Sequence, residues 1–265
     1  MIIQPVDPNF VPMKCWSSLL VAILAIPITT FSQLPRVPER PAVEYPSTKM
    51  TVEIWSDVVC PFCYIGKREF ESALERFPHK NEVEVVWKSF ELDPSAPERS
   101  EHDMYGMLVA KYGGTREDAA ARVESVVQRA KSVGLEYRMD KAVIGNSFQA
   151  HRLIQFAKTK GKGAEAEECL FKAYFMEGAQ LSDRSTLVGL AKEIGFEAAE
   201  VEAVLKSDAY TDEVRADERE AQQLGVQGVP FFVLDRKHGV SGAQSSDHFL
   251  GALEQAWNER AAAKP

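Results

Sequence analysis

Cysteine is scarce in this sequence, with only Cys15, Cys60, Cys63 and Cys169 among 265 residues. Because 45% of the residues are hydrophobic, the chain can bury a sizeable core without a disulfide scaffold. A zinc site needs about four ligands, but only one close cysteine pair is present, and no two of the histidines are closely spaced. The sequence therefore predicts neither a disulfide framework nor a metal site.

Clustered basic residues are also missing. The net charge is −8, and no block of lysine or arginine interrupts the acidic composition. Proteins that bind nucleic acid usually carry a basic patch that neutralises phosphates. We therefore expect no nucleic-acid partner.

Long apolar runs are missing except near the N-terminus, where residues 15–31 read "CWSSLLVAILAIPITTF" after Lys14. This pattern is typical of a secretory signal, and its length is marginal for a membrane span. Four prolines within residues 33–49 indicate a stiff, extended linker. If residues 14–31 are retained, the protein is exported or anchored to a membrane.

Met50 offers a competing interpretation, because it directly precedes the first segment with strand character. If translation starts there, residues 1–49 are not part of the protein, and a cytoplasmic location is expected. In both interpretations we exclude residues 1–49 from the fold.

A close cysteine pair lies in "VCPFCY", residues 59–64. The preceding residues 51–58 alternate apolar and polar side chains, which predicts a strand. From Cys60 to Pro78 apolar residues recur at helical spacing. Pro61 suits the first turn of a helix, where its missing N–H removes no hydrogen bond. The pair is therefore predicted at a junction between a strand and a helix.

The remaining elements follow from the same patterns. A second strand is predicted over 82–92, helices over 115–134, 146–158, 164–177, 183–194, 198–207 and 211–224, strands over 230–235 and 238–242, and a last helix from Ser245. The order is β-α-β, a helical block, then α-β-β-α. This predicts an α/β fold whose first part is residues 50–95, whose helical insertion is 96–210 and whose last part is 211–260.

This order, with C-x-x-C opening the first helix, resembles the thioredoxin fold of the DsbA-like thiol–disulfide oxidoreductases, and within them the FrnE-type members. Segments 53–68 ("EIWSDVVCPFCYIGKR"), 146–153 ("NSFQAHRL") and 225–244 carry the resemblance. The best-known DsbA enzymes have Pro-His between the cysteines, whereas this chain has Pro61 and Phe62. Phenylalanine cannot hydrogen-bond to a thiolate, so strong oxidising power is not implied.

Disulfide exchange requires a thiolate, which the N–H groups and dipole at a helix N-terminus favour. Cys60 is predicted at that position, facing those donors, and is our candidate nucleophile. Cys63 lies one turn into the helix, more deeply buried, and is the candidate resolving thiol. Phe62 supplies an apolar neighbour that can meet substrate.

The resemblance implies a second part of the site at Val229 and Pro230, with a cis peptide bond between them. The Val229 backbone would then pair with an extended substrate segment, as an added strand does. An ordinary trans proline at the start of an edge strand is the alternative.

Four further residues have open interpretations. Trp55 and Asp57 can both line the site. Trp55 can equally belong to the core. His151 either makes a structural hydrogen bond or serves the site, in contact with substrate or as a base. Glu91 is either a proton acceptor or an ordinary salt-bridged carboxylate.

The predicted function is thiol–disulfide exchange on protein or small-molecule thiols and disulfides, without a cofactor. The first alternative is glutathione chemistry, because the kappa-class glutathione transferases and the 2-hydroxychromene-2-carboxylate isomerases have a similar architecture; glutathione would then be a co-substrate. Those proteins typically place serine at the first active position, whereas Cys60 stands here. The second alternative is a redox-sensing or holdase-type binding protein without turnover.

Overall fold

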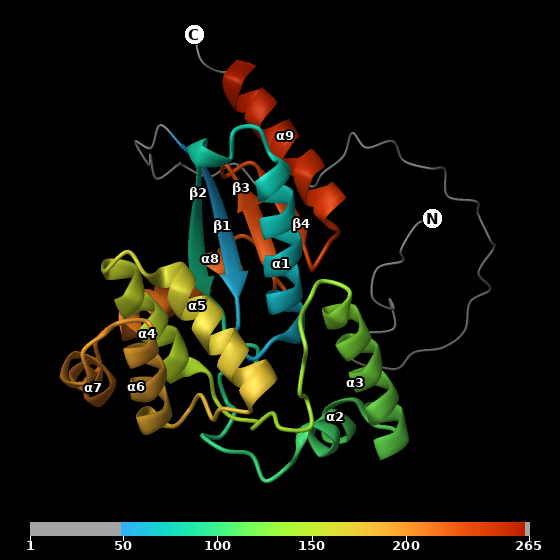
Figure 1. The fold of residues 1–265 in the computed structure, drawn as a ribbon, viewed down its shortest axis with the longest axis vertical. Coiled ribbons are helices and arrows are strands. Elements are labelled where there is room, and N and C mark those ends of the chain that lie inside the picture. Colours follow the sequence, from blue (N-terminus) through green and yellow to red (C-terminus); the bar gives the residue numbers. More distant parts are fainter. Residues whose placement is uncertain (1–48, 263–265) are drawn as a thin grey trace. The chain divides into compact units, whose positions relative to one another are not determined.

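The structure, a computed structural model, describes residues 49–262, and a four-stranded sheet in the order β2-β1-β3-β4 lies at their centre (Figure 1). Strand β1 (Met50–Ser56) pairs in parallel with β2 (Val83–Ser89) and antiparallel with β3 (Phe231–Leu234). Strand β4 (His238–Ser241) adds antiparallel to β3. The first and last parts of the chain thus build one sheet, as the predicted β-α-β and α-β-β-α parts require.

Helices cover this sheet and extend beyond one end of it. They are α1 (Pro61–Arg76), α2 (Met104–Tyr112), α3 (Arg116–Lys131), α4 (Phe148–Thr159), α5 (Gly163–Lys172), α6 (Arg184–Glu193), α7 (Ala198–Lys206), α8 (Thr211–Gln223) and α9 (Ser246–Ala262), with a 3₁₀ turn η1 (Lys80–Glu82) and a π-helical turn η2 (Ala173–Glu177).

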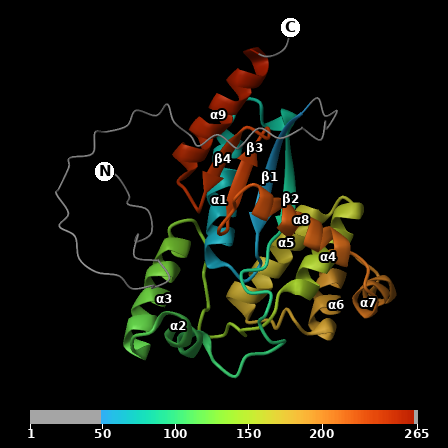
Figure 2. The same cartoon turned by 180° about the vertical axis from the view of Figure 1, so that it is seen from behind.

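The two faces of the sheet follow from the alternation of side chains along β1. Val52 and Ile54 lie in a core with Phe70 of α1 and Phe249 of α9. Trp55 points to the opposite face, where it packs with residues of β3 and α8. Figure 2 shows α8 on the side of the sheet opposite to α1. The sheet is therefore buried between two helical layers.

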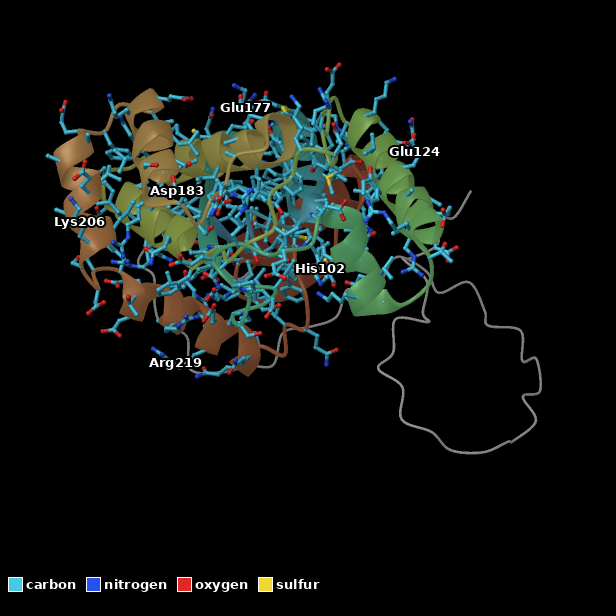
Figure 3. All side chains as sticks on the ribbon, turned by 90° about the horizontal axis from the view of Figure 1, so that it is seen from below. His102, Glu124, Glu177, Asp183, Lys206 and Arg219 are labelled. Carbon is cyan, nitrogen blue, oxygen red and sulfur yellow. The ribbon has the colours of Figure 1, made fainter. Side chains whose placement is uncertain are left out.

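Helices α2 to α7 form the block inserted between β2 and α8 (Figure 1). Their buried residues form one apolar core, and Cys60 and Cys63 belong to that same core. Charged residues such as Glu124, Asp183 and Lys206 lie at the periphery of the helices (Figure 3). The predicted fold, a thioredoxin fold with a helical insertion, is confirmed. The exact division into residues 50–95, 96–210 and 211–260 stays a prediction.

Three local predictions differ from the structure. Helix α2 was not expected, although Asp103 caps it by accepting a hydrogen bond from the Gly106 N–H. The predicted helix 164–177 changes after Lys172 into the π turn η2, which ends at Gly178 with φ 77°. The helix predicted over 146–158 begins later, because α4 starts at Phe148, whose N–H donates to the Asn146 side chain.

The signal-like segment 15–31 and residues 33–48 of the proline-rich linker lie outside the described residues. Among residues 49–262, no helix combines the length and the apolar character needed to cross a bilayer.

Candidate active site

Cys60 and Cys63 lie where β1 runs into α1. Cys60 is the N-cap of α1, with extended backbone (φ −88°, ψ 115°), and Pro61 occupies the first turn. The Cys60 N–H donates to the Asp57 carbonyl at 2.9 Å, and the Cys63 N–H donates to the Cys60 carbonyl at 3.1 Å. The predicted placement at the helix start is confirmed. The Cys60 thiol makes no capping hydrogen bond, however, so its expected orientation toward the helix N–H groups is wrong.

The two thiols differ in environment. Cys60 is 4% exposed and Cys63 is 1% exposed, and neither is in a disulfide. Burial raises the pKa of the Cys63 thiol well above its ordinary value, and the hydrogen bond and charge of Cys60 raise it further. Contacts of the Cys63 thiol with the Asp57 backbone and the Ser56 side chain act in the opposite direction. Cys63 is therefore held as a protonated thiol beneath Cys60.

The loop before β3 approaches Cys60 from the other part of the chain. The Cys60 thiol donates to the Val229 carbonyl at 3.5 Å, and the Val229–Pro230 peptide bond is cis. A Cβ at Gly66 of α1 would lie 2.9 Å from Pro230 Cγ, so the helix and the loop pack at the closest distance that glycine allows. The structure thus brings Cys60, Val229 and Pro230 together.

Tyr137, from the segment before α4, contacts the dipeptide between the cysteines. Its hydroxyl donates to the Pro61 carbonyl at 2.7 Å. Its ring stacks on Phe175 of η2, with 4.6 Å between the ring centroids. Phe62 is only half-buried, as is Val229, so apolar surface lies on both sides of Cys60. The inserted block therefore helps to position the cysteine turn.

Three buried titratable residues lie behind the pair, on the side of α4 and α5. Asp57 Oδ1 lies 3.4 Å from His151 Nε2, and both side chains are almost fully buried. Although burial opposes it, contact with Asp57 and the charge of Glu167 raise the pKa of His151. Burial raises the pKa of Glu167 to about 7. Among the described residues, no group of three or more His, Cys, Asp or Glu side chains is placed to hold a metal ion.

The structure bears on the open interpretations of Trp55, His151 and Glu91. Trp55 is 0% exposed and its indole N–H donates to the Asp217 carbonyl at 2.9 Å, so it is a core residue and does not meet substrate. His151 is also 0% exposed, which excludes direct contact with substrate. Glu91 forms a salt bridge with Arg215 at 2.5 Å. Cys169 is half-buried.

The sequence interpretation missed Gly66, Tyr137 and Glu167. A glycine inside a strongly helical segment is a signal of close approach, and Gly66 carries that signal. Tyr137 and Glu167 reach the site only through tertiary packing of the inserted block, and no local pattern marks them.

Comparison with known proteins agrees with this geometry. The family described as DSBA-like thioredoxin domain matches residues 51–254. The chain belongs to the DsbA-like thioredoxin family. It is 48% identical to a probable DsbA oxidoreductase from Streptomyces coelicolor, whose solved structure superposes with a TM-score of 0.77 over 82% of this chain and 92% of that one.

More distant relatives of this DsbA-like protein share its length or its fold. The uncharacterized protein YwbO of Bacillus subtilis (strain 168) is 29% identical over 205 residues, which cover 76% of this chain and 94% of YwbO. A cytosolic disulfide reductase, DsbM, from Pseudomonas aeruginosa is 17% identical, with a TM-score of 0.55 over 80% of this chain and 97% of DsbM. At that identity the likeness shows the fold alone.

Proposed function

We propose that the chain is a thiol–disulfide oxidoreductase that cycles Cys60 and Cys63 between dithiol and disulfide through a mixed disulfide with substrate. The observation that carries this proposal is the position of Cys60 at the N-cap of α1, with Cys63 one turn behind it and the Val229 carbonyl in front. No other pair of cysteines is close among the described residues.

The environments of the two thiols support different roles. Cys63 is the more buried, and its raised pKa keeps its proton in place, so Cys60 is the thiol better placed to attack substrate. The dipole of α1 favours a negative charge at its N-cap, although the Cys60 thiol makes no hydrogen bond to the N–H groups of the first turn. Cys60 therefore attacks the substrate, and Cys63 resolves the mixed disulfide.

The substrates we propose are protein or small-molecule thiols and disulfides. An extended polypeptide can pair with the backbone at Val229 while its sulfur meets Cys60, because the Cys60 thiol already contacts the Val229 carbonyl. Half-buried Phe62 offers apolar contact to the same segment. The FrnE-type assignment, the direction of electron flow and the compartment stay predictions; Phe62 in place of histidine removes one reason to expect a strong oxidant.

Reduction of insulin by dithiothreitol, followed as turbidity, tests the proposal. We expect the wild type to accelerate the reaction and Cys60→Ser and Cys63→Ser to lose that acceleration. Cys169→Ser is the matched control, because Cys169 is a half-buried thiol of the helical block, and it should retain full activity. Full activity in both active-site variants would refute the proposal.

Trapping of substrate separates the two roles. Cys63→Ser should accumulate a covalent complex through Cys60, since the resolving thiol is absent, whereas Cys60→Ser should not. Turnover of Cys60→Ser with glutathione or a chromene substrate would instead favour the glutathione-dependent alternative. A bound partner without turnover in the wild type would favour a binding protein.

A further inference from the structure

The Cys60 thiol points to a hydrogen-bond acceptor and not to the donors of α1. It makes no capping hydrogen bond to the first turn of the helix, and it donates to the Val229 carbonyl at 3.5 Å. When the thiol ionises, this bond is lost and the sulfur faces a carbonyl oxygen with partial negative charge. Phe62 has no polar side-chain group with which to compensate. A thiolate at Cys60 therefore gains from any positive field beyond the dipole of α1 and the Cys63 thiol.

Tyr137 supplies such a field at the cysteine turn, residues 60–63. Its hydroxyl donates to the Pro61 carbonyl at 2.7 Å, and Pro61 is bonded directly to Cys60. The positive end of the O–H dipole is therefore directed at the turn, where it offsets the partial negative charge of the Pro61 oxygen. Cancelling a negative charge beside a thiolate lowers the free energy of that thiolate.

The Tyr137 hydroxyl is held in place by the inserted block. The residue is 5% exposed. Its ring stacks on Phe175 with 4.6 Å between the centroids, and it lies parallel to the ring of Tyr64 at 6.2 Å. The next residue, Arg138, donates its N–H to the Phe175 carbonyl at 2.6 Å. A dipole that is already oriented needs no reorganisation when a charge appears, so its whole effect reaches the charge.

Electrostatic coupling between Tyr137 and the cysteines agrees with this geometry. Burial raises the pKa of Tyr137, and the charges of Cys60, Tyr64 and Cys63 raise it further. An electrostatic interaction acts equally on both of its partners, so the Tyr137 hydroxyl lies within range of a charge on Cys60.

We propose that Tyr137 is a positioning residue that sets the balance between the dithiol and the disulfide of Cys60 and Cys63, acting through the Pro61 carbonyl. This inference rests on the proposed function. By favouring a thiolate at Cys60, Tyr137 stabilises the reduced pair, and a stabilised reduced pair makes the disulfide a stronger oxidant. Tyr137 lies between α3 and α4, so the inserted block contributes to the chemistry of the pair.

Equilibrium with glutathione measures this balance. Oxidised glutathione takes two electrons and two protons from the thiols of Cys60 and Cys63. One S–S bond forms in the protein, the S–S bond of glutathione breaks, and two molecules of reduced glutathione result. The background is the full chain with Cys15→Ser and Cys169→Ser, so that only this pair reacts. The oxidised fraction is counted by mass after alkylation of free thiols, at pH 7 and over a series of glutathione ratios.

We expect Tyr137→Phe to raise the equilibrium constant for oxidation of the pair by about threefold to tenfold, the range that one hydrogen bond of modest net strength covers. Tyr64→Phe is the matched control. Tyr64 belongs to the same aromatic stack, and its hydroxyl makes a hydrogen bond of the same length, 2.7 Å, but to Glu168 of α5. This variant should leave the constant within about twofold, the scatter of changes that do not act on the pair.

Urea unfolding of each variant shows that it is folded before its equilibrium is measured. An unchanged or lowered constant in Tyr137→Phe would overturn the inference. An equal rise in Tyr64→Phe would also overturn it, because loss of either buried hydroxyl would then have the same effect. Failure of the proposed function is seen separately, since Cys60→Ser and Cys63→Ser would then accelerate insulin reduction as the wild type does. The two failures are therefore distinguishable.

Discussion

This DsbA-like protein buries charged side chains on both sides of β1, and the two groups are paired differently. The sheet-face cluster lies under α8 and consists of Glu53, Lys88, Asp217, Glu220 and Arg236. Lys88 lies 3.0 Å from Asp217 and 2.9 Å from Glu220. Burial works against the charge of Lys88, but these carboxylates outweigh it and raise its pKa. Each buried carboxylate here has a cation beside it.

The cysteine-side cluster consists of Asp57, His151 and Glu167. Among the described residues it lacks such ion pairs with lysine or arginine. Within residues 49–262, Glu167 makes no ion pair, and His151 lies 3.4 Å from Asp57. The Asp57 carboxylate accepts hydrogen bonds from the Val59 N–H at 3.3 Å and the Leu92 N–H at 2.8 Å. The backbone of Asp57 contacts both cysteines. We infer that the paired charges of the sheet-face cluster hold α8 against the sheet.

Removing the central cation of the sheet-face cluster, Lys88, should cause the largest loss of stability. Lys88→Met keeps the length of the side chain but leaves buried carboxylates without compensation. We expect a loss of about 3–5 kcal/mol of unfolding free energy, the usual cost of breaking a buried pair. Urea unfolding measures it. Lys160→Met, which breaks an exposed pair with Glu200, should leave stability unchanged. Equal stability of both variants would contradict the structural role.

The cysteine-side cluster should make the free energy of unfolding depend on pH. Burial raises the pKa of Glu167 from 4.5 to about 7, so the folded state prefers the neutral carboxyl. The resulting stability is present below pH 4.5 and is lost as pH rises to about 7, by about 3 kcal/mol in total. Glu167→Gln should remove this slope, as urea unfolding at a series of pH values will show.

Glu168, the next residue, provides an internal check, because its contribution to stability should depend on pH with the opposite sign. Although burial opposes it, hydrogen bonds from Arg68 and Lys67 lower the pKa of Glu168 to about 2. Its contribution is therefore lost as pH falls below 4.5, outside the window of Glu167. A wild type whose stability rises between pH 4.5 and pH 7 by more than the Gln variant does would refute the assignment.

The approach of Pro230 to α1 tests whether the cysteine side also depends on close packing. Gly66→Ala places a Cβ 2.9 Å from Pro230 Cγ, so the loop carrying Val229 must shift. We expect about 1–3 kcal/mol of destabilisation and reduced insulin reduction. Gly189→Ala is the control, since a Cβ there meets nothing within 4 Å. It should stabilise by about 0.4–1 kcal/mol. If both alanine variants retain wild-type activity, the loop is not part of the site.

The fold and the cysteine pair were predictable because local patterns determine them. Alternation in β1 separates Ile54 from Trp55, and Pro61 after Cys60 marks the helix start. The interpretations that the sequence left open concern Trp55 and His151, whose residue types are compatible with either a site or a core. Only the pairing of strands and helices decides which environment such a residue meets.

The cysteine-side cluster was not predictable for the same reason. Asp57 follows β1, His151 lies on α4 and Glu167 lies on α5, so nothing in their spacing joins them. The sequence identified Asp57 and His151 as candidates only through nearby motifs. Helix α2 was missed because the signal of its N-cap, Asp103, precedes a glycine-containing helix of only nine residues.

The smallest expected effect concerns Tyr137, the contact of the inserted block with the cysteine turn. Tyr137→Phe removes the hydrogen bond of 2.7 Å to the Pro61 carbonyl but keeps the ring stacked on Phe175. Because one buried hydrogen bond contributes about 1 kcal/mol net, urea unfolding should show a loss of that size. Insulin reduction should slow less than in Gly66→Ala, since Tyr137 contacts the cysteine turn and not the loop that carries Val229. A variant as slow as Gly66→Ala would mean that the hydrogen bond from Tyr137 to the cysteine turn limits activity as much as the close packing of the Val229 loop does.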